Sequence, residues 1–123
     1  MFNLFNSRPA AGGSQISATD AVDQVAAGTL ALIDVRDANE LAQTGKAEGA
    51  IHISLMTFQM KTDPRSPEVL ADLDIEKPVA IYCATGARSQ MAARMMMQMG
   101  YKTVHNLGGH GHWANAGGKI VRA

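Results

Sequence analysis

The fold of this chain is decided by one stretch, Val79-Ala80-Ile81-Tyr82-Cys83-Ala84-Thr85-Gly86-Ala87-Arg88. Its first four residues form a continuous apolar run, which is typical of a strand buried in a parallel sheet. The residues from Ser89 to Met99 place apolar side chains at helical spacing. The stretch therefore predicts a buried strand, a tight loop and a helix N-terminus, where backbone N–H groups converge with the helix dipole behind them.

Cys83, the only cysteine of the chain, stands at the start of this loop. A free thiol has a pKa of about 8.5, and helix N-termini and nearby cations lower that value to roughly 3.5–7.5. Arg88 supplies such a cation, and Gly86 can take the positive φ that turns N–H groups inward. A lone cysteine at a strand end is often an inert core residue. Glycine and arginine at these spacings instead favour a reactive thiolate.

Strand and helix patterns alternate on both sides of the loop. Strands are predicted over residues 30–35, 50–53, 79–82 and 103–106, and helices over residues 17–27, 37–44, 66–73 and 89–99. This alternation predicts an α/β fold, a doubly wound and mostly parallel sheet of about five strands with helices on both faces. Ligands bind beyond the carboxyl ends of the strands in such sheets, which is the edge where Cys83 stands.

The helix predicted after the loop contains five of the eight methionines of the chain. Met91, Met95, Met96 and Met99 fall on one stripe, and Met97 lies off it. Thioethers can bind Cu(I), but a stripe that faces the core is better explained by flexible packing. We therefore expect core methionines and no metal here.

Asp34 and Arg36 follow the strand predicted over residues 30–35. We expect Asp34 to cap the following turn and Arg36 to pair with Glu40, because such spacing is common in structural roles. These residues are not predicted to react.

His110 and His112 raise the question of a metal site. Two histidines two residues apart fall short of the three or four ligands that zinc needs. We expect instead a turn built by Gly108, Gly109 and Gly111.

Three motifs, in this order along the chain, resemble signatures of the rhodanese family of sulfurtransferases. Cys-x-x-Gly-x-Arg followed by Ser, between a strand and a helix, resembles the active-site loop of that family. The N-terminal signature of the family is similar to Leu32-Ile33-Asp34-Val35-Arg36, Glu40 and Gly49-Ala50-Ile51-His52-Ile53 of this chain. Its C-terminal signature is similar to Asn106-Leu107-Gly108-Gly109, Trp113, Ala116-Gly117-Gly118 and Val121. The resemblance covers about residues 16–121. It implies a single rhodanese-like domain over residues 16–123, after a flexible lead formed by residues 1–15.

The resemblance also implies an activity. Cys83 would take a sulfane sulfur from thiosulfate or another persulfide donor and pass it to cyanide, to a thiol or to a sulfur-accepting protein. The anion cradle would be formed by Ala84, Thr85, Gly86, Ala87, Arg88 and Ser89. No metal or organic cofactor is implied.

The chain departs from the family pattern at two places. Many members carry an arginine directly after the cysteine, where this chain has Ala84. Loss of that cation weakens the expectation of thiosulfate as donor, because a doubly charged donor gains from each nearby positive charge. Many members also have Gly-His-Ile where this chain has Gly45-Lys46-Ala47, a change that we interpret as structural.

Two alternative functions remain open at this stage. A cysteine phosphatase or arsenate reductase also uses a cysteine, an anion-binding loop and an arginine, but those loops resemble Cys-x5-Arg, one residue longer than the spacing from Cys83 to Arg88. The other alternative is a sulfur-relay or regulatory module that acts only when docked to a protein partner.

Composition bounds the remaining possibilities. A chain of 123 residues with 46% apolar composition fits one domain with a real core. Its 11 basic and 11 acidic residues give no net charge, so we expect neither a nucleic-acid nor a membrane partner. A single cysteine forms no internal disulfide, and the first residues lack a signal-peptide pattern, so we expect a cytoplasmic location.

Overall fold

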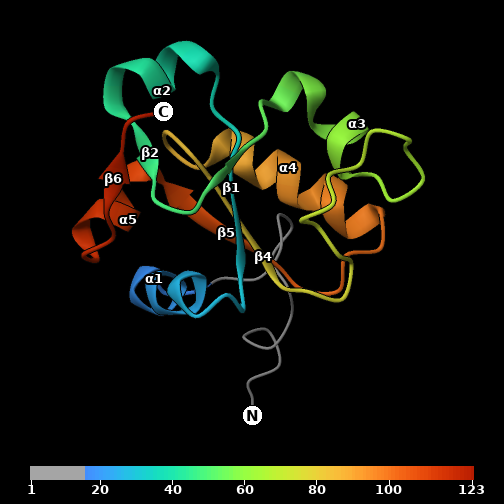
Figure 1. The fold of residues 1–123 in the computed structure, drawn as a ribbon, viewed down its shortest axis with the longest axis horizontal. Helices are drawn as coiled ribbons and strands as arrows, with labels where there is room; N and C mark the ends of the chain where they lie inside the picture. The colour runs from blue at the N-terminus through green and yellow to red at the C-terminus, as the bar shows by residue number, and fades with distance from the viewer. Residues whose placement is uncertain (1–15) are drawn as a thin grey trace.

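The computed structural model describes residues 16–123, and their backbone forms one main sheet with helices around it (Figure 1). Four parallel strands make up this sheet in the order β3-β1-β4-β5: β1 (Ala31–Asp34), β3 (Ile51–His52), β4 (Val79–Cys83) and β5 (Val104–Gly109). β2 (Lys46–Ala47) and β6 (Ile120–Val121) form a separate antiparallel pair. The predicted α/β fold is confirmed, with four strands in the main sheet where about five were expected. The predicted lead, residues 1–15, lies outside the described residues.

Helices follow most of the strands. They are α1 (Ala18–Ala26), α2 (Ala38–Thr44), the 3₁₀ helix η2 (Leu55–Thr57), α3 (Phe58–Thr62), α4 (Ala87–Gln98) and α5 (His110–Asn115). Side chains cap the starts of α1 and α2: the Ser17 hydroxyl accepts from the Asp20 N–H at 3.0 Å, and Asp37 and Glu40 form a reciprocal capping box. None of the helices within residues 16–123 has the length and apolar character needed to cross a membrane.

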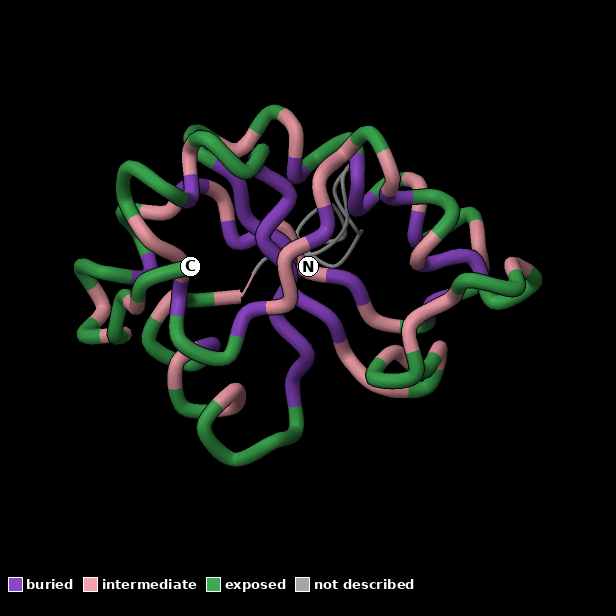
Figure 2. Tube along the Cα trace, turned by 45° about the horizontal axis from the view of Figure 1, so that its top comes forward, coloured by how far each residue is buried: buried purple, intermediate pink, exposed green. Residues whose placement is uncertain are grey.

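Alternation along the strands sends side chains into two cores. Ile33, Ile81 and Cys83 pack on one face of the sheet with residues of α3 and α4, whereas Leu32 and Tyr82 pack on the other face with residues of α1 and α5. Figure 2 shows the central strands as the buried part of the trace. Both faces are covered, which explains why β4 is apolar at every position rather than at alternate ones.

The helix predicted over residues 66–73 is wrong, because this segment consists of turns. The Ser66 hydroxyl accepts from the N–H of Glu68, two residues on, and so closes a local turn instead of capping a helix. The Leu70 N–H donates to the Lys61 carbonyl at 3.0 Å, which anchors the segment to α3. Leu70 and Leu73 are partly buried and pack against the hydrophobic core on the side of the sheet that α3 and α4 cover. Tertiary packing therefore overrides the local helix signal.

The methionine stripe of α4 is correct except at Met91. Met96 is fully buried, and Met95 and Met99 pack against the same core. Met91 is 55% exposed, because the buried face of α4 is centred on Ser89, Ala92, Ala93 and Met96. The methionines that face the sheet act as packing residues, as expected.

The loop after β4 lies where the order in which the chain adds strands to the sheet reverses. The chain passes from β1 to β3 on one side of β1, and then to β4 on its other side. α2 and α4, which follow β1 and β4, therefore begin at the same carboxyl edge. Crevices of this kind are where open α/β sheets bind ligands.

Candidate active site

Cys83 is the last residue of β4, and its side chain is buried beneath the start of α4. Its Sγ accepts from the Gly86 N–H at 2.9 Å and from the Ser89 N–H at 3.4 Å. Gly86 is the N-cap of α4, takes a φ of 112° and has no side chain to cap the helix. The cysteine sulfur therefore takes the place of a capping oxygen, with the N-terminal end of the helix dipole directed toward it.

The environment of Cys83 favours its thiolate. Burial by itself raises the pKa of the thiol, because a charged sulfur loses its hydration. Hydrogen bonds from the Ser89 side chain and from the N–H groups of Ser89, Gly86 and Thr85 outweigh that effect, so that the pKa of Cys83 lies below its ordinary value. These hydrogen bonds therefore favour the thiolate form of Cys83.

Ser89 is fully buried and connects the sulfur to β5. Its hydroxyl lies 3.5 Å from the Sγ of Cys83 and donates to the Oδ1 of Asn106 at 2.7 Å. Asn106 Oδ1 also accepts from the Gly108 N–H at 3.0 Å. When the sulfur is a thiol, its S–H can donate to the Ser89 oxygen; when it is a thiolate, the hydroxyl must turn toward the sulfur to stabilise it. Asn106 therefore competes with Cys83 for one proton.

An irregularity in β5 brings Asn106 to this position. Ile81 pairs with Asn106 and Tyr82 with Gly108, which leaves Leu107 as an extra residue in the strand. Gly109 then runs so close to the loop that a Cβ there would lie 2.7 Å from the carbonyl oxygen of Ala84. A side chain at this position would push β5 away from the loop.

Arg88 is bound to α2 and not to the sulfur. Its two terminal nitrogens donate to the two carboxylate oxygens of Glu40, each at 2.7 Å. This hydrogen-bonded pair lowers the pKa of Glu40 to about 2 and raises that of Arg88. The charge of Cys83 also contributes to the raised pKa of Arg88, which places the guanidinium within electrostatic reach of the sulfur.

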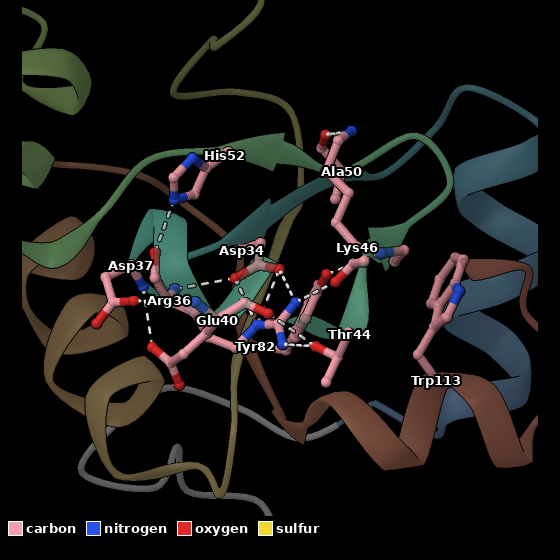
Figure 3. A network of polar contacts seen from close by, with 12 residues as sticks. Asp34, Arg36, Asp37, Glu40, Thr44, Lys46, Ala50, His52, Tyr82 and Trp113 are labelled. Carbon is pink, nitrogen blue, oxygen red and sulfur yellow. Dashed lines mark hydrogen bonds and ion pairs between the residues drawn. The ribbon is translucent and has the colours of Figure 1, made fainter. Parts of the chain in front are cut away.

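The expected pairing of Arg36 with Glu40 is wrong. Arg36 instead donates to both carboxylate oxygens of Asp34, and the two side chains are 3% and 0% exposed (Figure 3). It also donates to the hydroxyl of Thr44 at 2.7 Å, and its guanidinium lies 5.7 Å from the centre of the Tyr82 ring. Glu40 is turned away because, at the third position of α2, it folds back to the helix start and meets Arg88. The expected turn cap is confirmed: Asp34 accepts from the Arg36 N–H at 2.9 Å.

The remaining loop residues, which were expected to form an anion cradle, differ in exposure. Ala84, Thr85 and Ala87 are exposed, whereas Gly86 and Arg88 are half-buried. The N–H donors to the sulfur come from the part of the loop nearest the helix. Sequence reasoning gave no role in the site to Asn106, although the motif Asn106-Leu107-Gly108-Gly109 pointed to it, nor did it connect Glu40 with Arg88.

The two histidines take structural positions. The expected glycine turn is the start of α5 instead, after Gly108 with a φ of 95°. The Nδ1 of His112 lies 3.1 Å from the Leu107 carbonyl oxygen and fastens the junction of β5 and α5. The ring of His110 packs against that of Tyr82, with the centroids 5.9 Å apart.

The sequence matches the family model described as rhodanese-like domain over residues 17–116. The chain belongs to the rhodanese-like domain family. Its structure is similar to that of a protein of unknown function from Rhodopseudomonas palustris, described as a possible tyrosine phosphatase; the identity is 32%, the TM-score is 0.75, and the match covers 87% of this chain and 83% of that one. It is also similar to a rhodanese-related protein from Thermoplasma volcanium, at 27% identity and a TM-score of 0.69 over 89% of this chain and 98% of that one.

The rhodanese fold recurs in the human single-domain sulfurtransferase TSTD1. That match has 21% identity and a TM-score of 0.69, and it covers 82% of this rhodanese-like chain and 95% of the human one. At this level of identity the similarity concerns the fold alone.

Proposed function

We propose that this rhodanese-like protein is a sulfurtransferase in which Cys83 carries the sulfur as a persulfide. The observation that carries the proposal is the placement of the Cys83 Sγ at the start of α4, 2.9 Å from the Gly86 N and 3.4 Å from the Ser89 N. A thiolate held there needs no separate base to become a nucleophile. Residues 84–89 would form the cradle for the sulfur that it receives.

The reaction would proceed in two half-reactions. In the first, the Cys83 thiolate attacks the sulfane sulfur of the donor, a new S–S bond forms, and the donor's own S–S bond breaks with its electron pair leaving on sulfite or on a thiolate. In the second, a nucleophile such as cyanide or a thiolate attacks the terminal sulfur, and the electron pair of the broken S–S bond returns to Cys83. Such a cycle predicts ping-pong kinetics.

The cradle has features suited to the terminal sulfur of a persulfide. N–H groups at the start of α4 can donate to an anionic sulfur there, and the half-buried guanidinium of Arg88 comes from the first turn of this helix. The Ser89 hydroxyl can donate to the Cys83 sulfur once the latter is charged.

A phosphatase is the second candidate, favoured by the resemblance to the possible tyrosine phosphatase from Rhodopseudomonas palustris. Against it stand the four residues between Cys83 and Arg88 and the pairing of Arg88 with Glu40. A phosphatase uses its arginine to hold the phosphate oxygens, whereas this guanidinium is already taken up by a carboxylate. We therefore expect no hydrolysis of phosphate esters.

A sulfur-accepting protein is a further possible acceptor, since the loop residues next to Cys83 are exposed at the surface. A reactive thiol persists best in a compartment that keeps thiols reduced, which supports a cytoplasmic location.

The proposal is tested by measuring thiocyanate formed from cyanide with thiosulfate or a small-molecule persulfide as donor. Wild-type protein is expected to turn over with at least one donor, and Cys83→Ser to give only the uncatalysed rate. A generic phosphate ester is assayed in parallel with the same two proteins. Phosphate release that disappears in Cys83→Ser, without thiocyanate from either donor, would overturn the proposal in favour of the phosphatase.

A further inference from the structure

The cradle of this protein has a single formal charge of its own, and that charge is neutralised. Within residues 83–89, Arg88 is the only side chain with a permanent charge. Both of its terminal nitrogens are bound to Glu40 at 2.7 Å. The position after the cysteine, Ala84, adds no cation. An incoming anion therefore meets an ion pair and not a free guanidinium.

The Glu40 carboxylate is held in this position by the start of α2. Its Oε2 accepts from the Asp37 N–H at 3.0 Å, and its own N–H donates to the Asp37 carboxylate at 3.1 Å (Figure 3). Because the hydrogen bonds from Arg88 lower the pKa of Glu40 to about 2, the carboxylate is charged at neutral pH. The pair is thus present in advance of any substrate.

The charges around the sulfur have a consequence for donors. Asp37 also belongs to this group, because its carboxylate accepts from the Glu40 N–H and its charge acts on Arg88. With Cys83 as a thiolate, the charges of Cys83, Arg88, Glu40 and Asp37 add up to two negative charges at the start of α4. The neighbouring Arg36 does not alter this balance, because Asp34 pairs with it. The electrostatic repulsion energy between such a site and a dianion is twice that of a monoanion at the same distance, and a neutral molecule is not repelled.

We propose that Glu40 sets the charge of the sulfur donor, so that the site favours a donor with one negative charge or none, such as the persulfide of a neutral thiol, over dianionic thiosulfate. This inference deepens the proposed function and rests on it for the identity of the reaction. With such a donor, the Cys83 thiolate attacks the terminal sulfur of RS–SH, the new bond forms to Cys83, and RS⁻ leaves with the electron pair.

The charge effect is tested by alkylating Cys83 with two reagents of similar size, anionic iodoacetate and neutral iodoacetamide. The ratio of their rates, measured at one pH and low salt, cancels any change in the fraction of thiolate. Glu40→Gln keeps the shape of the side chain and removes its charge, so the ratio of iodoacetate to iodoacetamide should rise about threefold to tenfold. The rise should shrink in 0.5 M salt.

Glu48→Gln is the matched control. Glu48 is exposed and lies outside the site. Its substitution by Gln changes the net charge of the protein by the same amount as Glu40→Gln does. An unchanged ratio in Glu40→Gln, or an equal rise in Glu48→Gln, would overturn the inference.

The donor itself is tested with the same variants. Turnover with thiosulfate, relative to turnover with a neutral small-thiol persulfide, should rise in Glu40→Gln by a larger factor than the alkylation ratio, since thiosulfate carries two charges. A wild-type preference for thiosulfate that Glu40→Gln leaves unchanged would contradict the role of Glu40. Failure of both donors in every variant, with the alkylation ratio still responding to Glu40→Gln, would reject the sulfurtransferase and leave the electrostatic role of Glu40 standing.

Discussion

Two pairs of a carboxylate and an arginine lie at the same edge of the sheet, and they differ in burial. Asp34, the last residue of β1, and Arg36, in the turn after it, are 0% and 3% exposed. Glu40 and Arg88 are 29% and 36% exposed and join α2 to α4. Each arginine contacts both oxygens of its carboxylate. The pairs are thus alike in chemistry and opposite in their access to water.

The difference in burial indicates different roles. A buried pair has lost its hydration, so removal of one partner leaves an uncompensated charge and weakens the fold. A half-exposed pair keeps much of its hydration and contributes little to stability. Its charges can act on whatever approaches from solvent, and in the proposed function that is the sulfur donor of Cys83. We therefore assign the first pair to the fold and the second to the chemistry.

The largest expected effect is on stability, in Arg36→Met. Loss of the guanidinium leaves the buried Asp34 carboxylate without a positive charge to compensate it, which should lower the free energy of unfolding by about 3–5 kcal/mol. Urea unfolding followed by circular dichroism measures it. The double variant Asp34→Asn/Arg36→Met, in which no charge is left behind, should recover part of the loss. A change below about 1 kcal/mol in the single variant would break the comparison.

Ser89→Ala tests the hydrogen bond between the Ser89 hydroxyl and the Cys83 thiolate, which involves neither of the two ion pairs. Removing a hydrogen bond to a charged sulfur should raise the pKa of Cys83 by about 1–2 units. The pH dependence of iodoacetamide alkylation measures this pKa. Ser17→Ala, which removes the N-cap of α1, is a matched control that should cost about 1 kcal/mol of stability and leave the pKa of the thiol unchanged. Equal pKa values in wild type and Ser89→Ala would show that the N–H groups alone stabilise the thiolate.

The smallest expected effect on stability is that of Arg88→Met, the same substitution made in the exposed pair. The free energy of unfolding should change by less than about 1 kcal/mol. The pKa of Cys83 should nevertheless rise by about 0.5–1 unit, because the Glu40 carboxylate is left near the sulfur without its partner. Urea unfolding and the alkylation profile give the two quantities. A loss of stability as large as that of Arg36→Met would remove the distinction between the pairs.

The parts of the site that could be predicted from the sequence are local. The strand that ends at Cys83, the loop turned by Gly86 and the helix after it depend on neighbouring residues, and the structure has them as expected. The caps at Ser17 and Asp37 are equally local. Interactions within about one helical turn leave a pattern in the sequence that spacing alone reveals.

The parts that could not be predicted depend on how distant segments meet. Glu40 and Arg88 are 48 residues apart, and only the order of the strands brings α2 next to α4. The extra residue in β5 that places Asn106 beside Ser89 has no sequence signature beyond the glycines after it. The residues after Ser66 have a sequence pattern typical of a helix, but they form turns because Leu70 and Leu73 pack against the core in that conformation.

The measurement that most directly tests the central claim, that Cys83 carries sulfur, is the intact mass of the purified protein after exposure to a sulfur donor. Thiosulfate and a neutral-thiol persulfide are used separately, and each sample is measured before and after cyanide. We predict a gain of about one sulfur atom that cyanide removes, that is larger with the persulfide, and that is absent in Cys83→Ser. No gain with either donor, while iodoacetamide still alkylates Cys83 at neutral pH, would contradict the account.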